Sequence, residues 1–153
     1  MRVVIGADHR GFLHKQQIKE ALPGIEWIDV GSTSQERCDF PDFVKAAIEH
    51  MKLGKVERAV LLCGSGVGMS IAANRFPGIY AALAWNVDVA RVAREHNNAN
   101  ILVLPADFVT IEEALAMVTV WHNTEFLGGH YQKRIDAITS LPKALSKLIC
   151  QKR

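Results

Sequence analysis

The most constraining feature of this sequence is the regular alternation of short apolar runs with longer stretches in which apolar residues recur every three or four positions. The apolar runs cover residues 2–7, 25–30, 58–63, 79–84 and 100–104. The helical stretches cover residues 9–22, 39–53, 88–96 and 110–122, and a further one follows the glycine-rich turn after the third apolar run and ends at about residue 75. This order predicts an α/β fold, a three-layer sandwich in which a five-stranded parallel sheet is covered by helices on both faces.

The end of the chain adds one more helix to this pattern. Gly128 and Gly129 precede a helical stretch from about Tyr131 to Ile149, in which Pro142 is expected to bend or interrupt the helix. We find no internal repeat and no low-complexity linker. The sequence therefore predicts a single domain over residues 1–153, with residues 131–153 as a C-terminal helical extension.

Composition excludes several classes of function. The formal charge is +2, from 18 basic and 16 acidic side chains, which is too small an excess to predict binding to nucleic acid or to an anionic membrane. No apolar run is long enough for a membrane span, and no export signal is visible. Three cysteines do not suggest a disulfide framework, so we expect a cytoplasmic protein.

A glycine-rich turn after the third apolar run carries the clearest chemical signal. Cys63 ends that run and is followed by Gly64, Ser65, Gly66, Val67 and Gly68. In parallel sheets the ligand site lies at the carboxyl ends of the strands, and alternating glycines let backbone N–H groups turn toward one point. Such a cradle would stabilise an oxyanion and lower the pKa of Cys63. A base beside it suits an enediolate intermediate.

Other interpretations of this turn are weaker. The structural alternative is that Cys63 is a small core residue and the glycines only permit a tight turn. A dinucleotide-binding fingerprint needs its third glycine one position later than Gly68, and a P-loop needs a Gly-Lys-Ser/Thr that is absent. A cysteine phosphatase should have an arginine at the position of Met69. The sequence shows no spacing of metal ligands.

Three further segments contain candidate site residues, each with a structural alternative. Asp8 and His9 follow the first apolar run, where Asp8 could handle a hydroxyl proton or cap a helix. His96 could open a sugar ring by proton transfer, or simply end a helix together with Asn97. His130, Lys133 and Arg134 have helical spacing, which predicts a cationic face for a phosphate or a solvated surface.

Together these segments resemble the type B ribose-5-phosphate isomerase family, which also contains galactose-6-phosphate isomerase subunits. The resemblance runs from Val3 to about Ile138. The similar stretches are Gly6 to Phe12, Asp29 to Gly31, Cys63 to Gly68, Ile71 to Asn74, His96 to Asn100 and Gln132 to Ile135. It implies a Rossmann-like fold, no cofactor, and homodimers or tetramers whose sites lie at the subunit interface.

The resemblance also implies a role for each candidate residue. Cys63 would carry the proton between C1 and C2, while backbone amides of Gly64, Gly66, Val67 and Gly68 hold the enediolate. Ser65 stands where the family has Thr or Ser near the reacting oxygens. His96, assisted by Asp8, would open the ring, with Asn97 nearby as a hydrogen-bonding group. His9 and Arg134 would contact the phosphate, and His130 stands beside them.

Three positions depart from the family pattern. His130 and Asp107 stand where the family usually has phosphate-binding arginines, and Phe40 stands where it usually has tyrosine. Histidine is fully charged only below its pKa, and an inward-pointing aspartate would repel phosphate. The resemblance implies interconversion of D-ribose 5-phosphate and D-ribulose 5-phosphate, and the three departures leave alternatives open. The alternatives are the same chemistry on another sugar or sugar phosphate, and a non-catalytic subunit that binds a sugar phosphate.

Overall fold

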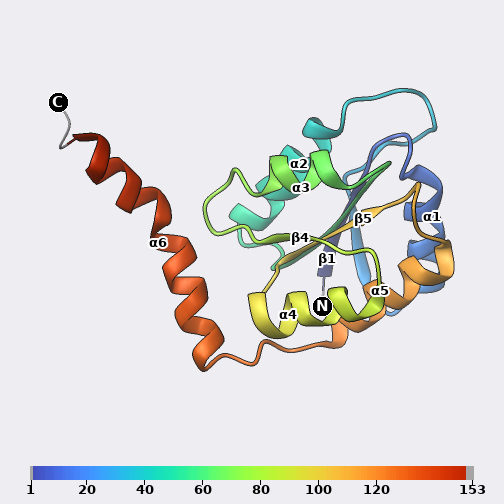
Figure 1. The fold of residues 1–153 in the computed structure, drawn as a ribbon. Coiled ribbons are helices and arrows are strands. Elements are labelled where there is room, and N and C mark those ends of the chain that lie inside the picture. The colour runs from blue at the N-terminus through green and yellow to red at the C-terminus, as the bar shows by residue number, and fades with distance from the viewer. Residues whose placement is uncertain (1, 151–153) are drawn as a thin grey trace.

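The computed structural model describes the backbone of residues 2–150 and the side chains of residues 2–141. The strands and helices alternate along the chain (Figure 1). In order they are β1 (Arg2–Ala7), α1 (Phe12–Ala21), β2 (Glu26–Asp29), α2 (Phe40–Lys52), β3 (Arg58–Cys63), α3 (Val67–Ala73), β4 (Ala81–Leu83), α4 (Val87–Asn97), β5 (Ile101–Pro105), α5 (Ile111–Asn123) and α6 (His130–Cys150).

All five strands are parallel and pair in the order β2-β1-β3-β5-β4. Every residue of β3 and β5 is buried, as expected for central strands with helices on both faces. The edge strands β2 and β4 are shorter and partly exposed. The predicted Rossmann-like α/β fold is therefore confirmed.

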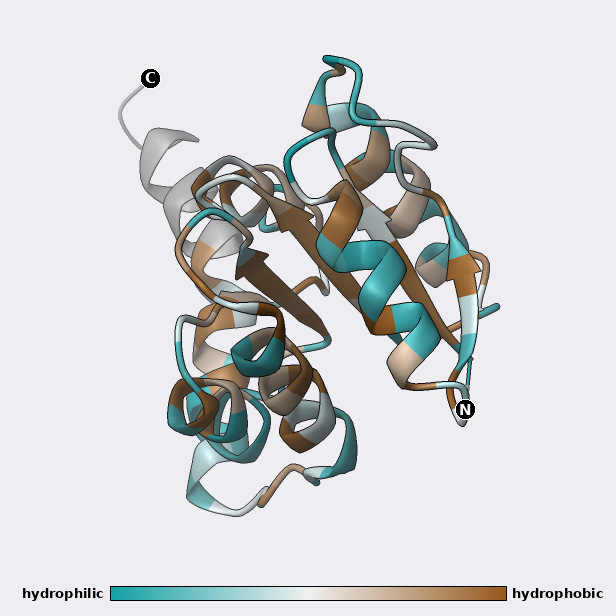
Figure 2. Ribbon diagram, turned by 90° about the vertical axis from the view of Figure 1, so that its right-hand side faces the viewer, coloured by the Kyte–Doolittle hydropathy of each residue, from teal (hydrophilic) through white to brown (hydrophobic). Residues whose placement is uncertain are grey.

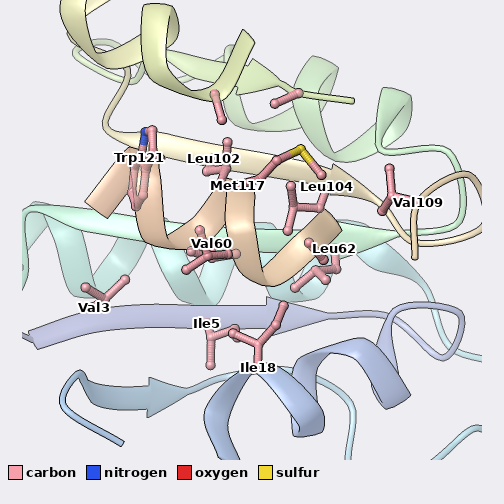
Figure 3. Packing of buried hydrophobic residues seen from close by; sticks show 14 of the residues in the cluster. Val3, Ile5, Ile18, Val60, Leu62, Leu102, Leu104, Val109, Met117 and Trp121 are labelled. Atoms are coloured by element: carbon pink, nitrogen blue, oxygen red, sulfur yellow. The ribbon is translucent and has the colours of Figure 1, made fainter. Parts of the chain in front are cut away.

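Two hydrophobic cores lie on opposite faces of the sheet because successive side chains of a strand point in opposite directions. Helices α1, α4 and α5 cover one face, where Trp121 and Met117 of α5 pack over Val60 and Leu102 (Figure 3). Helices α2 and α3 cover the other face. Apolar residues accordingly concentrate in the strands, and polar residues lie on the outer surfaces of the helices (Figure 2).

The sheet has a switch point between β1 and β3. The chain leaves β1 toward the β2 edge and leaves β3 toward the β5 and β4 edge. The two connections diverge at the carboxyl ends of these neighbouring strands, which is where open α/β sheets bind their ligands. Asp8 follows β1 and Cys63 ends β3, so the fold brings these two candidate residues to the same point.

Two predicted helices differ from the structure. The first helix begins at Phe12 rather than at residue 9, because the Asp8 carboxylate accepts the backbone N–H groups of Arg10 and Gly11 and holds them in a turn. The sequence predicts a bend or an interruption at Pro142; of these the interruption is wrong, since α6 continues from His130 to Cys150. A proline removes only one backbone donor, and the other turns keep theirs.

Helix α6 extends outward from the body that the other elements form (Figure 1). Residues 151–153 of the predicted extension lie outside the described residues. No helix in the described part of the chain is long and apolar enough to cross a membrane.

Candidate active site

The turn after β3 folds around the sulfur of Cys63. Gly66 has a φ of +73°, and its backbone N–H donates to Cys63 Sγ at 3.2 Å. A Cβ on Gly66 would lie 2.4 Å from Leu83 Cδ1, so both its backbone conformation and the available space require glycine. The turn therefore directs a backbone donor toward the candidate base, as the glycine pattern predicts.

The electrostatics of Cys63 correct one expectation. The thiol is only 5% exposed, and this burial raises its pKa above the ordinary value. Hydrogen bonds from the amides of Met69, Gly66 and Ser65 favour the thiolate, but they do not outweigh the burial, and the Asp8 charge opposes ionisation further. The predicted lowering of the pKa is therefore wrong, because burial raises the pKa of the Cys63 thiol.

Asp8 lies within electrostatic range of Cys63 and is buried. Its Oδ1 accepts the amides of Arg10 at 2.9 Å and Gly11 at 3.2 Å, so one oxygen shapes the turn before α1. No hydrogen bond to Oδ2 is formed within residues 2–141. Asp8 therefore shapes the turn before α1, but it does not cap the helix as the structural alternative predicts, because the N-cap residue is Gly11 and has no side-chain cap.

His9 faces the loop between β2 and α2. Its Nδ1 accepts the backbone N–H of Cys38 at 3.4 Å, and Cys38 Sγ lies 3.9 Å away. This loop borders an open pocket of about 350 Å³, lined by Gly31, Ser32, Thr33, Ser34, Glu36, Arg37, Cys38 and Phe43. The loop therefore orients His9 and forms one wall beside the switch point.

A buried lysine supports the same loop. Lys15 Nζ donates to the Ser32 carbonyl at 2.6 Å and to Asp29 Oδ1 at 2.8 Å. Burial alone would raise the pKa of Asp29, but hydrogen bonds from Lys15, Lys19 and the Gly31 amide lower it. Sequence analysis missed Lys15, because a lysine within a helical stretch gives no signal of burial.

Phe40 and Asp107, two of the positions that depart from the family pattern, lie against the glycine-rich turn after β3. A Cβ on Gly68 would be 2.7 Å from Phe40 Cζ, so the phenyl ring packs directly on the start of α3. Asp107 follows β5, and its backbone N–H donates to the Gly64 carbonyl at 3.0 Å. Its carboxylate is paired with Arg10 at 2.6 Å, so it is not an isolated negative charge facing a phosphate.

The segment from His96 to Asn100 lies at the other edge of the sheet. The carbonyl of Asn100 accepts the N–H of Ala59 at the start of β3. Cys63 is four residues farther along that strand, a distance of about 13 Å. One chain therefore does not bring His96 to Cys63.

Polar residues in this segment divide into two groups. Asn98 has a φ of +49° at the end of α4, and the Asn100 side chain bonds to Gly78 and Tyr80, so both are structural. His96 is partly exposed, and Asn97 is exposed beside a pocket of about 230 Å³ that Ile135 and Ile138 also line. Of these four residues, Asn97 lines that pocket, and His96 is next to it in sequence.

The ring of Tyr131 contacts candidate site residues of both α4 and α6. The rings of His96 and Tyr131 stack with centroids 4.3 Å apart. The His130 ring lies 3.9 Å from the same tyrosine, and the Arg134 guanidinium lies 5.7 Å from it. Sequence analysis assigned no role to Tyr131, although it lies directly after the candidate His130 in the sequence.

The predicted site residues thus form two groups in one chain. The carboxyl-edge group contains Asp8, His9 and the turn from Cys63 to Gly68, including Ser65 and Val67. The amino-edge group contains His96, Asn97, His130 and Arg134. Neither of the two pockets beside these groups is lined by Cys63. Among the described residues, no group of three or more His, Cys, Asp or Glu could hold a metal ion.

Comparison with known proteins gives a consistent result. The Ribose/Galactose Isomerase family matches residues 3–138. Ribose-5-phosphate isomerase B of Escherichia coli is 37% identical over 142 residues, covering 92% of this chain and 95% of that protein. The chain covers more than nine-tenths of this relative, so the likeness extends over the whole fold rather than one segment.

Solved structures agree. A ribose 5-phosphate isomerase from Thermotoga maritima has a TM-score of 0.88 at 43% identity, covering 91% of this chain and 97% of that one. The Mycoplasma genitalium ribose-5-phosphate isomerase B with bound ribulose-5-phosphate has a TM-score of 0.87 at 35% identity, covering 93% and 96%. From the family match, these identities and the shared fold, the chain belongs to the ribose/galactose isomerase family.

Proposed function

We propose that this protein interconverts D-ribose 5-phosphate and D-ribulose 5-phosphate by moving a proton between C1 and C2 through a cis-enediolate. The observation that carries the proposal is the placement of Cys63 Sγ at the switch point, inside a turn whose Gly66 amide points at it and beside buried Asp8. The ribulose-5-phosphate bound to the Mycoplasma genitalium relative supports the choice of sugar.

Cys63 acts as the base in this scheme. As a thiolate it takes the proton from C2 of the open-chain aldose, the electrons form the enediolate, and the same group returns the proton to C1. Backbone amides of Gly64, Gly66, Val67 and Gly68 hold the negative oxygens. The Ser65 hydroxyl is exposed and adds a donor at the mouth of the turn.

His96 and Asp8 open the sugar ring. A ring-opening acid must be accessible to the sugar and able to donate a proton, and His96 is the partly exposed imidazole of the amino-edge group. Asn97 adds a hydrogen-bonding amide beside it. Because Asp8 lies at the opposite edge of the same chain, this pairing requires His96 of a second protomer.

We therefore propose a homodimer, alone or within a tetramer, with each site built from two protomers. Exposed apolar side chains on neighbouring elements support such an interface: Ile71 on α3 is 63% exposed and Trp85 after β4 is 60% exposed. In this arrangement His9 of one protomer and His130 and Arg134 of the other bind the phosphate. We place the enzyme in the cytoplasm, where Cys38 and Cys63 remain free thiols.

The direct test is an isomerase assay on ribose 5-phosphate in EDTA, with free ribose as the comparison. We expect turnover of the phosphate ester, and we expect Cys63→Ala to abolish it while circular dichroism and the melting temperature stay close to those of the wild type. Substantial residual activity in Cys63→Ala would rule out Cys63 as the base. Faster turnover of free ribose would mean that the phosphate is not recognised.

One observation favours a second candidate, the same reaction on a different sugar. The Phe40 ring packs against Gly68 without a hydroxyl, so the site has one hydrogen-bonding group fewer than a tyrosine would supply. A panel of aldoses and aldose phosphates compared by kcat/KM distinguishes the candidates. A hexose or tetrose that exceeds ribose 5-phosphate would establish the alternative.

A further inference from the structure

The carboxyl edge of the sheet carries an ion pair that the chemistry above leaves unused. Arg10, in the turn before α1, donates through Nε to Asp107 Oδ2 at 2.6 Å. The pair spans 97 residues of sequence and joins the turn after β1 to the turn after β5. The pair therefore lies at the carboxyl edge of the sheet, across β3 from one turn to the other, and this edge is where open α/β sheets bind ligands.

This pair lies directly on the turn that holds Cys63. A Cβ on Gly64 would be 2.5 Å from Asp107 Oδ2 and 2.7 Å from Arg10 Nε. The carbonyl of Cys63 accepts the N–H of Ala106, and the carbonyl of Gly64 accepts the N–H of Asp107, so both turns are fixed to each other. The guanidinium therefore stands one residue from the candidate base.

The geometry leaves the outer end of the guanidinium available. Asp107 takes only Nε, and within residues 2–141 the two terminal amino groups of Arg10 form no hydrogen bond. The side chain is 56% exposed, and it follows His9 directly in the sequence. A guanidinium fixed at Nε and open at both terminal nitrogens can bind two oxygens of one phosphate.

We propose that Arg10 binds the phosphate group of the substrate and that Asp107 positions its guanidinium. This inference rests on the proposed function, because it takes a sugar phosphate as the substrate. Asp107 is a positioning residue here, since its carboxylate touches Arg10 rather than the ligand. Arginine stays charged at every working pH, so Arg10 adds a permanent cation on the same protomer as His9.

The test compares the wild type with Arg10→Ala, Arg10→Lys and the control Arg2→Ala. Arg2 is also an exposed arginine beside a carboxylate, Glu26, but it lies at the start of β1. We expect Arg10→Ala to raise the KM for ribose 5-phosphate and the inhibition constant of inorganic phosphate by about ten-fold or more, with a smaller change in kcat. Arg10→Lys should lie between, and Arg2→Ala should match the wild type.

A second background separates phosphate binding from simple charge neutralisation. In Asp107→Asn the neighbouring charge is gone, while the amide oxygen can still accept from Arg10 Nε and keep the guanidinium in position. If Arg10 binds phosphate, Arg10→Ala still raises KM strongly in the Asp107→Asn background. If the effect of Arg10→Ala disappears there, Arg10 only neutralises Asp107 and the inference is overturned. A KM within two-fold of wild type in Arg10→Ala would overturn it as well.

Failure of the proposed function can be told apart from failure of this inference. Absence of ribose 5-phosphate turnover in the wild type would refute the proposed function. Calorimetric binding of inorganic phosphate to the wild type and to Arg10→Ala then tests Arg10 by itself. Weaker binding to Arg10→Ala supports the inference, and equal binding, or no binding to either protein, overturns it.

Discussion

At the scale of single residues, Cys63 shows two opposing demands on a buried base. Burial at the end of β3 shields the reacting atoms from water, and the same burial raises the thiol pKa. The amides of Met69, Gly66 and Ser65 offset part of that effect. Burial is the larger of the two effects, so the net shift of the Cys63 pKa is upward.

The net effect of burial and hydrogen bonding predicts that Cys63 titrates at a higher pH than an ordinary thiol. In a Cys38→Ser, Cys150→Ser background, ultraviolet thiolate absorbance should give Cys63 a midpoint above the ordinary value of 9.0. Since the Asp8 carboxylate opposes ionisation, Asp8→Asn should lower that midpoint. The ascending limb of kcat/KM should follow the same midpoint as pH rises. A midpoint below 9.0 would contradict the burial argument.

At the scale of elements, the turn from β3 into α3 determines the site. Gly66 is the residue before α3, and its left-handed backbone lets its N–H point back at Cys63 Sγ. Asn86 caps α4, and Thr110 and Glu113 form a capping box on α5, whereas α1, α2 and α3 begin without a side-chain cap. At the start of α3 the Gly66 amide bonds to the Cys63 sulfur.

Gly66→Ala should therefore damage both stability and catalysis. A side chain at a left-handed φ costs about 1–2 kcal/mol, and this Cβ would also meet Leu83 Cδ1 at 2.4 Å. We expect urea unfolding to show a loss of at least about 1 kcal/mol and kcat to fall as the amide leaves Sγ. The matched control is Gly24→Ala, whose Cβ would meet nothing within 4 Å. Unchanged kcat in a stable Gly66→Ala would show that this amide does not act.

At the scale of the whole molecule, the separation of the two groups is the main feature. The Cys63 group lies at the carboxyl edge of the sheet, and the His96 group lies at the amino edge beside α6. A parallel sheet places consecutive turns alternately at these edges, so residues from the two kinds of turn lie far apart within one chain. The proposed oligomer would bring Cys63 of one protomer to His96 of another.

Mixing two inactive variants tests the shared site. Cys63→Ala and His96→Ala should each lose activity, because each removes one half of every site. After denaturation and refolding together, half of the dimers are mixed and each has one intact site, so about a quarter of wild-type activity should return. Activity no higher than the mean of the two separate variants would place Cys63 and His96 in one protomer.

Much of the architecture follows from local patterns. The apolar runs predict β1 and β3 with their observed bounds, since a strand buried on both faces has few polar positions. The glycine spacing after Cys63 predicts a turn of backbone donors, because only glycine takes the conformation of Gly66 without strain. Asn98 has a left-handed backbone at the end of α4, a conformation that asparagine tolerates, which agrees with the structural alternative for its segment.

Residue identities and spacing by themselves therefore determined the strand and helix segments and the candidate residues, because hydrophobic periodicity and turn preferences act over a few positions. The alternation of these segments predicted the parallel sheet of the α/β fold, because strands connected through helices pair in parallel. Only the tertiary structure decided the direction of the Cys63 pKa shift, the burial of Lys15, the pairing of Arg10 with Asp107 and the division of the site into two groups. Each of these depends on packing between segments distant in sequence, where desolvation and partner charges are set by the completed fold.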